Sequence, residues 1–180
     1  MQSEYPLASF VQAHPSNYRK GQPGRRITNI VPHCTDGHGA AKGTAEMFAQ
    51  RNERAASAHF VVGQAGEVIQ CVRLDDIALH AHDANAFSIG IEHCARTPKE
   101  LGPNDPGLPP TEAQYLASAQ LVAWLCDSLG LPRDRNTIQG HAEIDKKTTH
   151  TKCPTGCGWD WDHYIELVVA VDVPQLMAAA

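Results

Sequence analysis

Hydrophobic and polar positions along the chain follow the helical period most clearly between Thr111 and Gly130. Apolar side chains recur there at positions 115, 119, 122, 125 and 129, in steps of three and four residues, which places them on one face of an α-helix. Thr111 is suited to cap the amino end of this helix, and Gly130 is suited to end it. TAEMFAQRNERAA (44–56) and WDHYIELVVAV (161–171) carry shorter helical patterns, so we predict helices there as well.

Short runs rich in β-branched residues lie between these helices. ITNIVPH (27–33), SIGIEHC (88–94) and NTIQGH (136–141) each predict one strand. AHFVVGQAGEVIQCV (58–72) predicts two strands joined by a hairpin at residues 64–67. LGPNDPGLPP (101–110) contains four prolines and predicts a loop. Because strands and helices alternate, we predict an α/β fold with a central mixed sheet flanked by helices.

The length of 180 residues suits a single domain. We expect an N-terminal arm over residues 1–24, the folded domain over 25–172 and a C-terminal tail over 173–180. The 15 Lys and Arg residues against 20 Asp and Glu give a net charge of −5. This balance does not favour a phosphate backbone, so we expect no nucleic-acid partner.

The apolar runs are too short for a membrane span, which needs about 18 consecutive apolar residues. The first 26 residues are polar and interrupted by prolines, unlike a secretory signal peptide. We therefore expect synthesis in the cytoplasm without a signal peptide, and no membrane insertion.

The chain contains six cysteines and ten histidines. A domain of this size does not need disulfides, so a reduced compartment is expected. Four cysteines lie in apolar segments and are interpreted as buried apolar residues: Cys34, Cys71, Cys94 and Cys126. The number of histidines indicates metal binding or acid–base chemistry.

Three predicted strands carry, at or near their ends, residues that can bind a metal or transfer a proton, namely His33, Glu92 and His141. Strand ends are where α/β sheets commonly carry their sites. The alternation of SIGIE places Glu92 on the face opposite the two isoleucines. A catalytic zinc ion needs three protein ligands and one open position. The two histidines and a cysteine of the 153–157 loop would supply the ligands, leaving Glu92 to handle protons.

The loop HTKCPTGCG (150–158) offers two cysteines for this role. Cys153 stands twelve residues after His141 and directly before Pro154, which fixes the local backbone and lacks an N–H group. If Cys157 also bound the metal, the open position for water would be lost. A closed, structural zinc site that includes Cys157 remains the alternative at this point.

Five stretches in order, IVPHCT, SAHFVVGQAGEVIQCV, LHAHDANAFSIGIE, QGHAEI and TKCP, resemble the zinc-dependent N-acetylmuramoyl-L-alanine amidases. That family includes phage endolysins, cytosolic muropeptide amidases and peptidoglycan recognition proteins. The resemblance covers about residues 25 to 167. It implies a mixed sheet flanked by helices, one zinc ion at the edge of a groove, and hydrolysis of the amide that joins N-acetylmuramic acid to L-alanine.

The same resemblance implies three zinc ligands: His33, His141 and Cys153. Glu92 matches the catalytic acid–base. Thr151 stands where many members have a lysine that stabilises the oxyanion, so we expect Thr151 to be catalytic by donating a hydrogen bond to the oxyanion. His80 and Asn85 match positions that line the groove. Ala58 replaces a tyrosine found in some members, so we expect proton transfer to depend more on Glu92. Other histidines stay unassigned, except that His59 is interpreted as a packing or supporting residue.

The implied substrate is peptidoglycan or a muropeptide, and we expect a monomer. We predict a lytic, endolysin-type enzyme that reaches the cell wall after holin-type or other release. Two alternatives are a cytosolic enzyme that recycles muropeptides, and a non-catalytic peptidoglycan-binding module.

Overall fold

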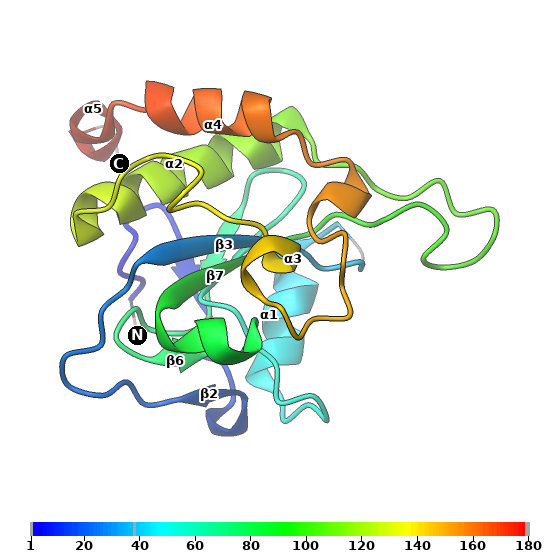
Figure 1. The fold of residues 1–180 in the computed structure, drawn as a ribbon, viewed down its shortest axis with the longest axis horizontal. Helices are drawn as coiled ribbons and strands as arrows, with labels where there is room; N and C mark the ends of the chain where they lie inside the picture. Colours follow the sequence, from blue (N-terminus) through cyan, green and yellow to red (C-terminus); the bar gives the residue numbers. More distant parts are fainter. Residues whose placement is uncertain (1, 38, 179–180) are drawn as a thin grey trace.

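The central feature of the structure, a computed structural model that describes residues 2–37 and 39–178, is a five-stranded sheet (Figure 1). Its strands, in spatial order, are β1 (Ser9–Phe10), β5 (Val68–Gln70), β4 (Phe60–Val62), β7 (Ser88–His93) and β3 (Asn29–Cys34). β4 and β5 are antiparallel, and every other neighbouring pair is parallel. The mixed sheet is therefore as predicted. A separate two-stranded sheet pairs β2 (Tyr18–Arg19) with β6 (Ile77–Ala78).

Helices cover both faces of the main sheet. α2 (Glu112–Leu129), α4 (Trp161–Ala170) and α5 (Val173–Ala178) pack together on one side, and α1 (Ala41–Ala49) packs on β4 and β5 (Figure 1). Successive side chains of β4 point to opposite faces of the sheet. Phe60 and Val62 therefore join the core cluster under α2, while Val61 joins the cluster under α1. Burial of these two apolar layers holds the sheet in place.

The longest helix begins and ends where the sequence predicts. The Thr111 side chain accepts a hydrogen bond from the Gln114 N–H at 3.1 Å, and Gly130 takes the left-handed conformation with φ of 66°. The predicted hairpin over 58–72, the loop over 101–110 and the helix over 161–171 are also confirmed. Short 3₁₀ helices η1 (Pro15–Asn17), η2 (His82–Ala86) and η3 (Thr155–Cys157) complete the chain.

Two predicted elements differ from the structure. The strand predicted over 136–141 is wrong, because only Ile138 makes an isolated bridge with Ile30, and His141 begins the short helix α3 (His141–Ile144). The helix predicted over 44–56 begins earlier and ends at Ala49. Beyond it, the Asn52 side chain bonds the backbone of Ala56 and closes a turn.

The segments predicted as an arm and a tail both pack on the domain. β1 extends the main sheet beside β5, and Tyr5 is buried against the ring of Trp124. At the other end, α5 contacts α2 and buries Val173. Residues 1, 179 and 180 of these segments lie outside the described part. Within the described residues, no helix combines the length and apolar character that a membrane span requires.

Candidate active site

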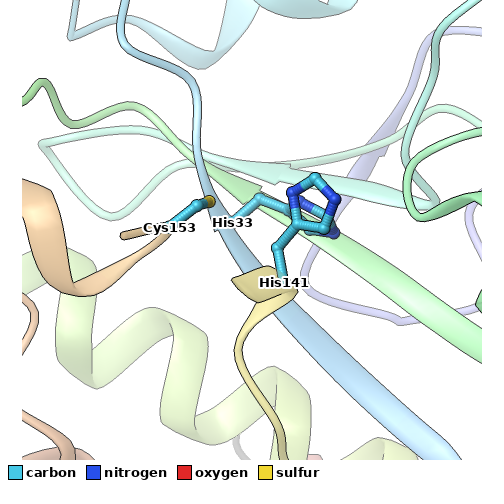
Figure 2. A group of neighbouring side chains, drawn as sticks. All are labelled: His33, His141 and Cys153. Atoms are coloured by element: carbon cyan, nitrogen blue, oxygen red, sulfur yellow. The ribbon is translucent and has the colours of Figure 1, made fainter. Parts of the chain in front are cut away.

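Three predicted ligands meet at one end of the sheet (Figure 2). His33 lies near the end of β3, His141 begins α3, and Cys153 lies in the loop between α3 and η3. One possible ligand atom from each of the three side chains lies within 4.8 Å of the other two. The two imidazole rings are 4.5 Å apart between centroids. The loop after α3 is therefore long enough to return Cys153 to the histidines.

Each of the two imidazoles is supported through its Nε2 atom. His33 Nε2 lies 2.9 Å from His80 Nδ1, and His141 Nε2 lies 3.1 Å from Asp145 Oδ2. Nδ1 of each ring is left for a metal ion. Histidines that bind metals usually engage their second nitrogen with a neighbouring group in this way, which fixes the ring orientation.

The protonation state of the two histidines suits a cation. Burial, followed by the neighbouring His80 and His141, holds the pKa of His33 well below its usual value, and burial also lowers the pKa of His141. Both rings are therefore neutral at neutral pH, the form that coordinates metals. Burial raises the pKa of the Cys153 thiol, while the backbone N–H of Cys34 donates to Cys153 Sγ at 3.2 Å.

Two imidazoles and a thiolate are a donor set that fits zinc, and three protein ligands leave one coordination position for water or substrate. This count matches a catalytic site. Cys157, the alternative fourth ligand, is buried and donates its S–H to the Pro154 carbonyl at 2.9 Å. It is not part of the three-residue group that could hold a metal among the described residues.

Asp145 is a supporting residue that sequence reasoning missed. Its buried carboxylate accepts from His82 Nδ1 at 2.6 Å and from the Lys147 N–H at 2.9 Å, in addition to its contact with His141. Asp145 thereby connects α3 to η2. The spacing of four residues from His141 was the one signal that could have indicated it, because such residues share a helix face.

Glu92 lies opposite His33 in the register of β3 and β7, and it lines the same cavity. Its Oε2 atom is buried and has no hydrogen-bond partner within residues 2–37 and 39–178. Burial, with a smaller contribution from Asp36, raises the pKa of Glu92 from 4.5 to about 8. A carboxyl group that titrates near neutral pH can both accept and donate a proton. Ile89 and Ile91 are buried on the other face, as predicted.

A cavity of about 760 Å³ extends from these residues toward α1 and the loop that follows it. Gly43, Thr44 and Met47 of α1 form part of its wall. Apart from its chain neighbours and the backbone of its own helix, a Cβ atom at Gly43 would meet no atom of the described residues within 4 Å. Met47, half exposed at 50%, offers an apolar surface there. The cavity is large enough for part of an extended peptide or sugar.

Two predicted site residues, Thr151 and Asn85, do not line the cavity. Thr151 is exposed and lines a smaller hollow of about 170 Å³ rather than the cavity, and residues 151–154 form turns. Asn85 does not line the cavity either. Its Oδ1 atom accepts the backbone N–H groups of His80 at 2.9 Å and Ala81 at 2.6 Å, so it supports the segment that carries His80.

His59 and most of the other cysteines are buried. His59 is fully buried, accepts the Gly90 N–H through Nδ1 and contacts the Asp76 carbonyl through Nε2, which confirms a packing role. Cys71, Cys94 and Cys126 are buried as predicted, whereas Cys34 is only partly buried. His38, which stays unassigned, lies outside the described residues.

Comparison with known proteins gives a consistent result. A family profile described as N-acetylmuramoyl-L-alanine amidase matches residues 23–156. The 1,6-anhydro-N-acetylmuramyl-L-alanine amidase AmpD of Haemophilus influenzae is 31% identical over 130 residues. This match includes 67% of the present chain, which spans 63% of the length of that relative.

Solved structures show the same fold. A selenomethionine derivative of AmpD superposes with a TM-score of 0.71 at 23% identity, covering 93% of this chain and 98% of that one. The amidase LysC from Clostridium intestinale superposes with a TM-score of 0.65 at 19% identity, covering 92% and 99% of the two chains. The catalytic domain of XlyA gives 0.66 at 22% identity, covering 89% and 98%.

Proposed function

The chain belongs to the N-acetylmuramoyl-L-alanine amidase family, and on this premise we propose that it hydrolyses the amide bond between N-acetylmuramic acid and L-alanine of the peptidoglycan stem peptide. One observation carries the proposal. The residues that could hold a metal, His33, His141 and Cys153, line the same cavity as Glu92, a partly buried residue whose pKa lies near neutrality. A metal site and a proton-transfer group that face one cavity are the parts that amide hydrolysis requires.

The proposed cofactor is one zinc ion per chain, held by His33, His141 and Cys153. When bound, zinc supplies Lewis-acid polarisation of the scissile carbonyl and activation of a water molecule. Asp145 and His80 keep the two imidazoles in position through their Nε2 atoms. The Cys34 N–H donates to Cys153 Sγ and so stabilises negative charge on that sulfur.

Glu92 handles the proton in the proposed reaction. In its ionised form, it accepts a proton from the attacking water, and it then donates this proton to the nitrogen of the departing L-alanine. Without protonation the amine would be a poor leaving group. A pKa of about 8 suits both steps, because a carboxylate with the ordinary pKa would donate its proton much less readily.

The form of the substrate has two candidates. The sequence prediction favours intact peptidoglycan and a lytic role. The 31% identity to a protein named as a 1,6-anhydro-N-acetylmuramyl-L-alanine amidase favours soluble anhydro-muropeptides. Both substrates contain the same scissile amide, so the proposed roles of the residues apply to either.

The deciding experiment incubates the zinc-loaded protein with purified peptidoglycan and, separately, with a soluble 1,6-anhydro-muropeptide. Mass spectrometry should detect a free stem peptide that begins with L-alanine, and the relative rates identify the preferred form. If the protein binds one or both substrates but releases a stem peptide from neither, it is a binding module and the proposal is wrong. Unfolding on removal of zinc by a chelator would instead indicate a structural site.

A further inference from the structure

His150 brings a further imidazole to the candidate active site. Its ring stacks near that of His141, with centroids 5.9 Å apart and an interplanar angle of 30°. It lines the large cavity together with His33, Glu92 and Cys153. The sequence alone leaves His150 unassigned and assigns the hydrogen bond to the oxyanion to Thr151.

The backbone explains why the two neighbours differ. The His150 N–H donates to Thr148 Oγ1 at 3.0 Å, and the Cys153 N–H donates to the His150 carbonyl at 3.1 Å. This second bond closes a turn over residues 150–153. In the turn, His150 borders both the cavity and the smaller hollow, whereas Thr151 borders only the smaller hollow.

A hydrogen-bond donor beside the metal would add to the stabilisation of the carbonyl oxygen of the scissile amide, which becomes negatively charged in the transition state. His33 and His141 are not available as donors, because their Nε2 atoms make the supporting contacts and they are proposed metal ligands. Glu92 is proposed to transfer the proton. His150 is exposed to solvent at the edge of the cavity, and within the described ranges 2–37 and 39–178 its imidazole makes no hydrogen bond to another residue. An imidazole carries at least one N–H in both its neutral and its protonated form.

We propose that His150 is a further catalytic residue, which donates a hydrogen bond from its imidazole to the oxygen of the scissile amide as negative charge develops there. This inference rests on the proposed amidase function. The contact forms no covalent bond and transfers no proton. It should therefore act on turnover and leave metal binding unchanged.

The test compares His150→Ala and His150→Gln with the wild-type protein, using a soluble muropeptide or peptidoglycan, whichever the wild type hydrolyses. His163→Ala is the matched control, because His163 is a partly exposed histidine that pairs with Glu112 on the helical face. Loss of one oxyanion donor typically lowers kcat by about 100-fold to 1,000-fold. We expect a decrease of this size in His150→Ala, partial recovery in His150→Gln through its amide N–H, and no change in the control.

Zinc affinity is measured in the same variants by competition with a chelating dye, and folding by thermal unfolding. Wild-type kcat in His150→Ala overturns the inference. A large loss of zinc affinity in this variant also overturns it, because His150 would then be a metal ligand. A lower kcat in Thr151→Val with normal turnover in His150→Ala would restore the sequence prediction instead. If the wild-type protein hydrolyses neither substrate, the proposed function fails together with the inference.

Discussion

Glu92→Gln should lower catalysis and raise stability in the same protein. Glutamine fills nearly the same space as glutamate but cannot accept a proton from water. General acid–base groups typically contribute about 100-fold to 10,000-fold to the rate, so we expect kcat to fall within this range. Zinc content should remain at the wild-type level, because Glu92 is not among the three candidate ligands.

The effect on stability follows from the buried carboxyl group. The pKa of Glu92 rises from 4.5 to about 8 in the folded protein, mainly through burial. At about 1.4 kcal/mol per pKa unit, ionised Glu92 therefore destabilises the fold by about 5 kcal/mol at most. The cavity admits water to the carboxylate once it ionises, so we expect about half of this value.

The pH dependence has a definite direction. Between pH 4.5 and about 8, the folded protein holds the Glu92 proton more tightly than the unfolded chain does. The contribution of Glu92 to the free energy of unfolding is therefore fully retained below pH 4.5 and decreases as the pH rises to about 8. Glutamine does not titrate. The stability gained in Glu92→Gln should be small in acid and largest above pH 8.

The assay is urea unfolding of the chelator-treated proteins at about pH 5 and about pH 9, values chosen inside and above the titration range of Glu92. Glu166→Gln is the control, because Glu166 is an exposed residue of α4 and its charge should not affect stability measurably. An equal stability difference between Glu92→Gln and wild type at both pH values would refute the argument from burial. Wild-type turnover in zinc-loaded Glu92→Gln would refute its role in proton transfer.

Three further predictions address the support of the site. Asp145→Asn should weaken zinc binding by about 10-fold to 100-fold, since it removes the carboxylate that holds His141; unchanged affinity in a chelator competition would contradict this role. Gly43→Ala should stabilise α1 by about 0.5–1 kcal/mol, because the added Cβ atom has open space. The same methyl group should narrow the cavity and raise KM. A lower thermal midpoint would show that the helix does not tolerate the methyl group. Cys153→Ser should abolish zinc binding and hydrolysis, whereas Cys157→Ser should retain both, and the reverse pattern would mean that the ligand is wrongly assigned.

The sequence by itself determined the elements whose signals lie within a few residues. The apolar spacing of α2, its Thr111 cap and its Gly130 end are local features, and each appears in the structure as predicted. The alternation in β7 likewise placed Glu92 on the face opposite the buried isoleucines. Such patterns are reliable because helix and strand geometry alone decides which neighbouring residues share a face.

The order of the motifs also identified the three candidate ligands before any geometry was available. His33, His141 and Cys153 come from separate segments, and no short metal-binding spacing connects them. Their meeting point depends on β3 and on the path of the chain around α3. The sequence indicated which residues could form the site, while the fold brings these residues within reach of one another.

Tertiary structure alone decided the elements that distant contacts create. β1 has two residues, too few to show a period, and it forms because β5 offers hydrogen-bonding groups beside it. Asp145 lies four residues from His141, but its second partner, His82, reaches the same carboxylate only because the fold brings η2 there. His150 borders the cavity and Thr151 does not, in a turn that is closed by the bond from the Cys153 N–H to the His150 carbonyl. Backbone dihedral angles in such a turn depend on contacts across the fold, including the Cys34 N–H that bonds Cys153 Sγ, and the local sequence does not specify those contacts.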